Sequence, residues 1–293
     1  MAIVDFVFNP CSGSFSERRM GRFVAALENA GFEVRPVATA ADGVSIAPDA
    51  ELVCVHGGDG TVRDVVQALG ERAGQVALAV APSGTINLVA REIGYSRRPD
   101  QFAQQLAQAW ARGPETWLKS PLYRLGELPV VSCLSIGPDS SAVARVSGGL
   151  KARVGRLAYV AAMAQQMREW PRSAISLRGE LADGTPFSCE AEAVIVSRGA
   201  FYAGPFRLSP KAALASHTIE LITLRSSTRL RTLAFSLAAM LHLPVDRFGF
   251  AEIRSVRRVE LGRCITPVQV DGDHIPGSAH TIAPSDITLS YVA

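Results

Sequence analysis

The sequence predicts a two-domain α/β protein, in which a Rossmann-like parallel α/β domain over residues 1–122 precedes an antiparallel β-sandwich-like domain over residues 123–283. Two observations favour this class. In the first part, short apolar runs alternate with stretches of helical periodicity, as in parallel strands joined by crossover helices. In the second part, short alternating runs are separated by turn residues, which is typical of antiparallel sheets. A chain of 293 residues is long enough for two domains with separate cores.

Apolar runs predict four strands in the first domain, at residues 3–8, 33–37, 53–56 and 75–81. Apolar residues at helical spacing predict helices that run to Gly31, over 62–69, from Ile86 to Gly94 and over about 100–111. Strands that alternate with helices favour a parallel sheet with helices on its faces. A last strand over 287–291 is a candidate to rejoin this domain, which would then include residues 284–293.

Three of these strands end in turns rich in glycine and hydroxyl residues, at residues 9–13, 57–61 and 82–85. The carboxyl ends of parallel strands meet at one edge of the sheet, where such folds bind ligands. Glycine lets a ligand approach the backbone, and a helix N-terminus directs unpaired N–H groups towards it. The turns therefore predict a phosphate site. Because no lysine precedes Lys119, a Walker-type loop is excluded, and backbone N–H groups, arginine or a metal must neutralise the phosphate.

Two acidic residues near the second turn have alternative interpretations. Asp59 is a candidate ligand, direct or through water, for the magnesium of a nucleoside triphosphate, or a cap for a neighbouring N–H group. Thr61 and Asp64 have the spacing of a capping box, so Asp64 has either a capping or a catalytic role. His56 beside this turn and His274 near the end of the chain are expected in packing or turn roles.

In the second domain, short strands are predicted at residues 117–125, 130–136, 175–181, 191–196, 219–224, 256–261 and 268–270. Helices over 155–169 and 230–243 interrupt them, and a proline follows each one. The segment 145–172 mixes arginines with apolar residues. That composition fits an amphipathic helix packed on its own sheet and also an interfacial helix on anionic lipid.

Composition excludes several classes of protein. The net charge is only +3 and the sequence has no basic stripe, which argues against a nucleic-acid-binding protein. Five scattered cysteines without a CxxC pair indicate free thiols in a reducing compartment and argue against a zinc site. No apolar run is long enough to span a membrane, and the N-terminus has the pattern of a strand and not of a signal peptide. The expected location is cytoplasmic, with any membrane contact peripheral.

Five motifs are spread along nearly the whole chain, from residue 9 to residue 273. They are Asn9-Pro10-Cys11-Ser12-Gly13, Gly57-Gly58-Asp59-Gly60-Thr61, Pro82-Ser83-Gly84-Thr85-Ile86-Asn87 with Ala90-Arg91, Ile136-Gly137-Pro138-Asp139, and Val268-Gln269-Val270-Asp271-Gly272-Asp273. Singly, the turn motifs are weak signals. In this order they resemble the diacylglycerol kinase and sphingosine kinase-like lipid kinases, including their bacterial soluble members.

The resemblance implies a nucleotide-binding first domain, a lipid-binding second domain, ATP and Mg²⁺ as cofactors, and a lipid or lipid-like amphiphile as substrate. It implies that a base on the Asp271-Gly272-Asp273 turn deprotonates the lipid hydroxyl, with the choice between Asp271 and Asp273 open, and that Asp59 contacts the catalytic magnesium. The implied ATP-binding residues are Asn9, Pro10, Cys11, Ser12, Gly13, Thr39, Gly57, Gly58, Asp59, Gly60, Thr61, Asp64, Ser83, Gly84, Thr85 and Asn87.

Three single residues and one residue pair depart from the family pattern. Asp64 and Asp273 stand where many members have glutamate, and Leu88 stands where many have aspartate. Ser216-His217 replaces the Asp-Gly pair of a structural magnesium site in bacterial members, so we expect that site to be altered or lost. The alternatives are a soluble NAD kinase-like enzyme and a sensor with weakened catalysis. The sequence does not identify which lipid is phosphorylated or the oligomeric state, for which a homodimer is one candidate.

Overall fold

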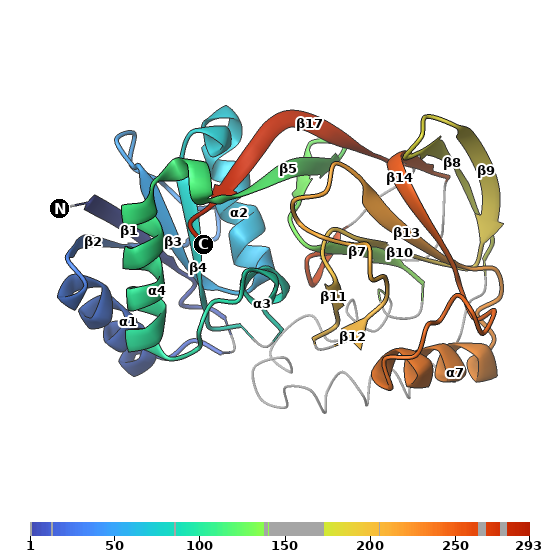
Figure 1. Ribbon diagram of the computed structural model, residues 1–293, viewed down its shortest axis with the longest axis horizontal. Coiled ribbons are helices and arrows are strands. Elements are labelled where there is room, and N and C mark those ends of the chain that lie inside the picture. Colours follow the sequence, from blue (N-terminus) through green and yellow to red (C-terminus); the bar gives the residue numbers. More distant parts are fainter. Residues whose placement is uncertain are drawn as a thin grey trace. The chain divides into compact units, whose positions relative to one another are not determined.

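The computed structural model describes residues 2–12, 14–84, 86–137, 140, 173–204, 206–262, 268–275 and 280–293 (Figure 1). The chain divides into two compact units, residues 1–122 together with 285–293, and residues 123–284. The first unit is built on a parallel sheet with helices and the second on antiparallel strands. The predicted fold class is therefore confirmed.

Parallel strands form the sheet of the first unit in the order β17-β4-β3-β1-β2. Its strands are β1 (Ala2–Phe8), β2 (Phe32–Ala38), β3 (Leu52–Gly57), β4 (Ala77–Pro82) and the end of β17 (His280–Tyr291). Its helices are α1 (Glu17–Asn29), α2 (Asp59–Leu69), α3 (Leu88–Ile93) and α4 (Pro99–Arg112), with short 3₁₀ turns η1 (Gly70–Gly74) and η2 (Pro114–Thr116).

The packing of this unit follows from its apolar pattern. Every residue of β3 and β4 is buried, as expected for central parallel strands with both faces covered. Helices α1 and α4 lie side by side on one face (Figure 1), where the rings of Phe23 and Phe102 meet edge to face with centroids 5.5 Å apart. The Ser16 hydroxyl caps α1 by accepting from the Arg19 N–H, 3.4 Å away.

In the second unit, antiparallel strands follow the order β16-β15-β7-β10-β13-β14-β17, with β8 beside β14 and β9 beside β8. β5 (Leu118–Leu125), which starts in the first unit, pairs with β6 (Leu128–Val130). The other strands are β7 (Cys133–Ile136), β8 (Ile175–Leu181), β9 (Pro186–Ala191), β10 (Ala193–Ser197), β11 (Phe201–Tyr202), β12 (Phe206–Arg207), β13 (Ile219–Leu224), β14 (Glu252–Leu261), β15 (Val268–Val270) and β16 (Asp273–Ile275). Helix α7 (Arg229–Met240) follows β13 in the chain.

Two predicted strands of the second unit are each divided in two. The stretch 130–136 contains the end of β6 and all of β7, and 191–196 contains the end of β9 and most of β10. Strands β9, β11, β12 and β16 are not predicted, because they are polar or only two or three residues long. The helix predicted at 155–169 and the segment 145–172 lie outside the described residues. None of the described helices is long and apolar enough to cross a membrane.

Candidate active site

The strand register brings the three glycine-rich turns to one edge of the parallel sheet. Phe8 at the end of β1 pairs with His56 of β3, and Gly57 pairs with Pro82 at the end of β4. The Gly57 carbonyl accepts from the N–H of Ser83 at 3.4 Å and of Gly84 at 3.3 Å. The second and third turns are therefore hydrogen-bonded to each other.

Two glycines allow this close approach. A Cβ atom on Gly84 would lie 2.7 Å from the Cα of Gly58, and one on Gly57 would lie 2.5 Å from the Cβ of Thr61. Real Cβ atoms do not tolerate such distances, so a side chain at Gly84 would push the second and third turns apart, and one at Gly57 would displace Thr61 within its own turn. The motif glycines thus have a packing function in addition to the access that they give to a ligand.

Helix α2 begins earlier than the sequence indicates. Gly58 is its N-cap and Asp59 its first residue, and the Val62 N–H donates to the Gly58 carbonyl at 3.1 Å. The predicted capping box is therefore wrong, because Thr61 lies inside the first turn, and Asp64 pairs instead with Arg63 at 2.9 Å. No side chain of the described residues caps α2. The N-terminus of α2 thus presents backbone N–H groups at the sheet edge, which suits an anion.

Asp59 joins the second turn to the third. Its buried carboxylate accepts from the N–H groups of Leu88 and Val89, both at 2.9 Å, at the start of α3. The preceding Asn87 has a left-handed backbone with φ 53°, and its Nδ2 donates to the Gly84 carbonyl at 2.5 Å. Leu88 thus contributes its backbone N–H where many family members have a carboxylate. Contact of Asp59 with magnesium stays a prediction.

The first turn is shaped by Asn9. Its Oδ1 accepts from the Cys11 N–H at 2.9 Å, and its carbonyl accepts from the Ser12 N–H at 3.2 Å. The Thr39 N–H donates to the Phe8 carbonyl at 2.9 Å, so the segment after β2 also reaches this edge. Of the other predicted ATP-binding residues, Gly13 and Thr85 lie outside the described residues.

Arg19 is a site candidate that the sequence analysis missed. It lies on α1, and its Nη2 donates to the Pro82 carbonyl at 2.9 Å, beside the third turn. Partial burial, together with the neighbouring Arg97, lowers the pKa of its guanidinium below the ordinary value. The absence of lysine before Lys119 was the available signal, because it makes arginine one of the few groups that can neutralise phosphate there.

His56 serves packing at this edge, as predicted. Its ring stacks on Phe6 with centroids 5.4 Å apart and lies 5.0 Å from the Phe23 ring. Burial, and secondarily the charge of Arg19, lower its pKa to about 4. Neither ring nitrogen has a hydrogen-bond partner within the described parts of the chain, so the imidazole is neutral at physiological pH.

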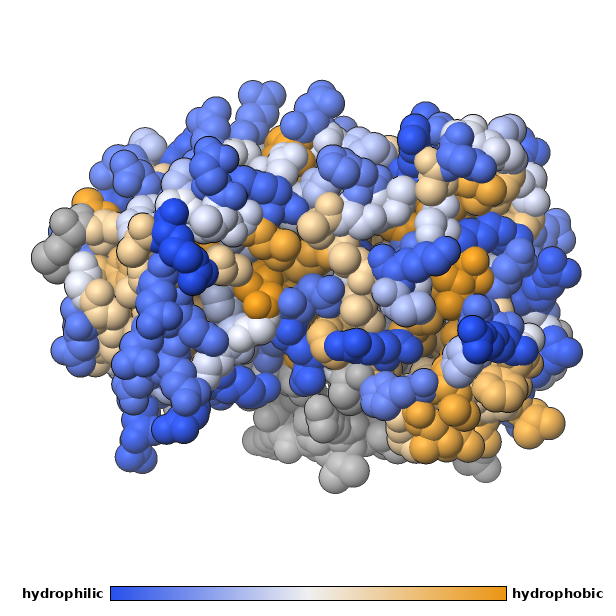
Figure 2. All heavy atoms as spheres, viewed as in Figure 1, coloured by the Kyte–Doolittle hydropathy of each residue, from blue (hydrophilic) through white to orange (hydrophobic). Residues whose placement is uncertain are grey.

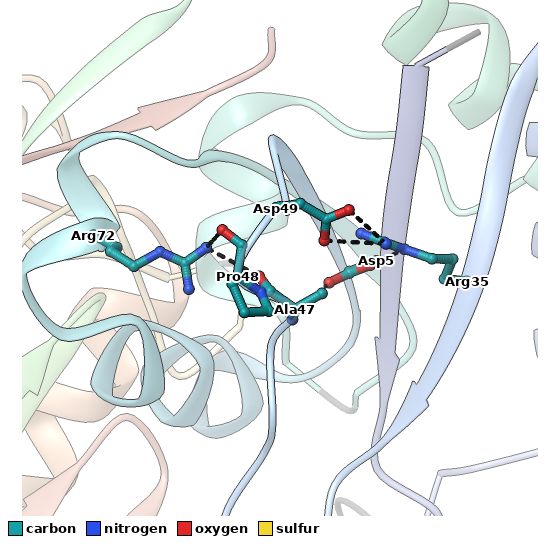
Figure 3. Close-up of polar contacts among 6 residues, drawn as sticks. All are labelled: Asp5, Arg35, Ala47, Pro48, Asp49 and Arg72. Carbon is teal, nitrogen blue, oxygen red and sulfur yellow. Dashed lines mark hydrogen bonds and ion pairs between the residues drawn. The ribbon is translucent and has the colours of Figure 1, made fainter.

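A polar network holds the loop before β3 (Figure 3). The buried Asp5 carboxylate accepts from Arg35 Nε at 2.7 Å and from the Ala47 N–H at 3.2 Å. Arg35 also pairs with Asp49, and Arg72 donates to the Ala47 carbonyl at 3.0 Å. These contacts anchor the loop to the sheet, so we assign them a structural role.

In the second unit, the two aspartates of the late turn have different surroundings. Asp271 is 5% exposed, and its Oδ1 accepts from the Ser132 N–H at 2.8 Å, the Ser132 hydroxyl at 2.7 Å and the Cys133 N–H at 3.1 Å. Its Oδ2 accepts from the Val131 N–H at 3.0 Å. Asp271 therefore fastens the link between β6 and β7, whereas Asp273 is half-buried at the start of β16.

A buried arginine from outside the segment binds the stretch that is predicted to have lost a structural magnesium site. Arg198 is 1% exposed, and its Nη2 donates to the Leu214 carbonyl at 3.1 Å and its Nη1 to the Ser216 carbonyl at 3.4 Å. The guanidinium also lies over the Tyr123 ring, 4.6 Å from its centroid. Ser216-His217 supplies no carboxylate, and the guanidinium charge would repel a divalent cation. These residues do not fit a magnesium ion.

Comparisons with known proteins agree with the motifs. Residues 4–115, which contain all three turns, match the family model described as "Diacylglycerol kinase catalytic domain". The resemblance to the diacylglycerol kinase-like lipid kinases is confirmed. A diacylglycerol kinase of Bacillus subtilis is 33% identical over 99 residues, which are 31% of this chain and 33% of that protein. A Pseudomonas putida protein named "Probable lipid kinase YegS-like" is 30% identical over 127 residues, 43% of this chain and 41% of that protein.

Two solved structures share the fold over most of the chain. A crystal structure of a diacylglycerol kinase from Bacillus anthracis str. Sterne aligns with a TM-score of 0.65 and 17% identity, covering 98% of this chain and 96% of that one. A second crystal structure from the same organism aligns with a TM-score of 0.71 and 18% identity over 98% and 94%. The sequence alignments span less than half the length of the curated relatives.

Proposed function

We propose that the protein is a magnesium-dependent kinase that transfers the γ-phosphate of ATP to a hydroxyl group of a lipid or lipid-like amphiphile. The observation that carries this proposal is the linked pair of turns, in which Gly57 accepts from Ser83 and Gly84 while Asp59 accepts from the start of α3. The sequence match to the kinase family covers the same residues. Phosphoryl transfer depends mainly on positioning and charge neutralisation, which rigid turns and backbone N–H groups supply.

In this proposal, the N-terminus of α2 binds phosphate through the N–H groups of its first turn, and Arg19 adds a positive charge. The turn at Asn9 and the neighbouring Thr39 complete the ATP site. Magnesium, when bound with the nucleotide, would neutralise part of the phosphate charge. Both oxygens of Asp59 already accept N–H groups, so we propose that Asp59 contacts the ion through water.

We assign the general base to Asp273. Asp271 has its oxygens engaged by four donors, so it is poorly placed to accept the proton of a substrate hydroxyl. Asp273 is half-buried and lies two residues away on the same turn. A carboxylate in that position is suited to receive the proton of the lipid hydroxyl.

The proposal is tested by incubating the protein with radiolabelled ATP and a panel of diacylglycerols, sphingoid bases, ceramides and phosphatidylglycerol, and in a separate reaction with NAD. Label is expected in an organic-soluble product only when magnesium is present. Label on NAD instead of lipid would support the NAD kinase-like alternative. ATP binding without transfer to any acceptor would support a sensor.

A further inference from the structure

Helix α7 has two apolar faces, and only one of them is covered. Thr232, Phe235, Ala238 and Ala239 are buried against the rest of the second unit. On the other side, large apolar side chains are exposed at helical spacing: Leu230 at 78%, Leu233 at 56%, Leu237 at 49%, Met240 at 52% and Leu241 at 56%. At 100° per residue, this stripe is centred opposite the buried face.

The exposed stripe continues past the end of the helix. Leu243 and Phe248 are 41% and 56% exposed, and together with the α7 stripe they account for all but one of the exposed large hydrophobic residues in the described part of the chain. Figure 2 shows apolar side chains gathered over α7 at the lower right of the molecule. We call these seven residues the α7 patch. A helix that is apolar all round is normally buried, so the α7 patch indicates a surface that something covers.

The charges around the patch identify its partner. Arg229 and Arg231 on α7 and Arg247 beyond it are exposed, and Asp246 is the one acidic residue between residues 229 and 248. A second copy of the chain would bring these positive charges together. An anionic bilayer attracts them, while leucine, methionine and phenylalanine side chains enter the boundary between headgroups and acyl chains.

We infer that the α7 patch is a docking surface for an anionic lipid bilayer. This inference deepens the proposed function, because a kinase that acts on a membrane lipid must reach the bilayer surface. It places membrane contact on α7, which corresponds to the helix that the sequence predicts over residues 230–243 without assigning it a function. Vesicle binding needs no ATP and no turnover, so the result is independent of whether the protein is a kinase.

The test is cosedimentation with vesicles of phosphatidylglycerol mixed with phosphatidylcholine, and with vesicles of phosphatidylcholine alone. Wild type is expected to bind the mixed vesicles and to be released by high salt. The double variant Leu233→Ser/Leu237→Ser is expected to bind about tenfold more weakly. The double variant Arg229→Gln/Arg231→Gln is expected to lose about fivefold per arginine.

A matched control removes two positive charges elsewhere in the same unit. Arg257 and Arg258 on β14 have side chains 56% and 53% exposed and form surface ion pairs with Glu180 and Glu260. The variant Arg257→Gln/Arg258→Gln is expected to bind like wild type.

Three results would overturn the inference. The first is equal vesicle binding, or none, by wild type and by the leucine variant. The second is a wild-type dimer in sedimentation that Leu233→Ser/Leu237→Ser dissociates, since a second copy would then cover the patch. The third is a lower urea midpoint for the same variant, since the chain itself would then cover it.

Discussion

The assignment of different roles to Asp271 and Asp273 is tested by one substitution, Asp→Asn, at both positions. At Asp271, the amide nitrogen would replace one oxygen and face a backbone donor such as the Val131 N–H. One bond is lost, a buried N–H is left without an acceptor, and the remaining bonds lose their charge assistance. The expected loss is about 2–4 kcal/mol of the free energy of unfolding. Backbone strain makes no contribution, because asparagine tolerates the left-handed φ of 51° at this position.

At Asp273, the same substitution is expected to leave the free energy of unfolding within about 1 kcal/mol of wild type, because the side chain is half-buried at a strand end. The kcat for phosphoryl transfer is expected to fall by about 10²–10⁴, which is the contribution of a positioned base. Urea denaturation followed by circular dichroism measures the first quantity, and initial rates at saturating ATP measure the second. Full stability with lost kcat for Asp271→Asn, together with unchanged kcat for Asp273→Asn, would refute the assignment.

Three further predictions concern packing and charge. Gly84→Ala is expected to lower the free energy of unfolding by about 1–3 kcal/mol and to weaken ATP binding, because its Cβ would meet Gly58. Gly21→Ala, which lies in open space on α1, is expected to raise the free energy of unfolding by about 0.5–1 kcal/mol. Urea denaturation measures the stability of each variant, and ATP titration measures the binding. The pKa of His56 is lowered to about 4 in the folded protein, so as pH falls below about 6.5 a proton binds to His56 in the unfolded chain first. The free energy of unfolding is therefore expected to fall by about 3 kcal/mol between pH 6.5 and pH 4. In His56→Leu, the free energy of unfolding measured against pH is expected to lack this decrease. Arg198→Met is expected to lower the free energy of unfolding by about 2–4 kcal/mol, because it leaves the Leu214 and Ser216 carbonyls without this donor. EDTA is expected to leave the melting temperature of the ATP-free wild type unchanged, and a lower melting temperature with EDTA would indicate a structural metal.

The parallel half of the fold was largely predictable, because its strands are continuous apolar runs and its turns carry glycine. The start of α2 was not. Gly58 and Gly60 are poor helix formers, so the segment has the sequence pattern of a turn, and only the bond from the Val62 N–H to the Gly58 carbonyl shows that the helix has begun. Thr61 therefore lies inside the helix and is not its cap.

Residue roles that depend on distant partners could not be predicted. Asp59 accepts from Leu88 and Val89, about thirty residues away, and no local pattern indicates that pairing. Asp271 accepts from residues 131–133, which are 138–140 residues away in the sequence and become neighbours only because β15 pairs with β7. Arg19 is one of many arginines in the sequence, and only the fold brings it to Pro82. The sequence therefore indicated the chemistry of the site better than it indicated what holds the site together.

The most direct test of the proposed function compares transfer of the γ-phosphate of ATP to lipid by wild type and by Asp273→Asn, with magnesium and with EDTA. Wild type with magnesium is predicted to label a lipid, EDTA to abolish the label, and Asp273→Asn to reduce its rate by about 10²–10⁴ while ATP binding is retained. Absence of label on every lipid of the panel, with tight magnesium-dependent ATP binding intact, would contradict the proposal that this protein is a lipid kinase.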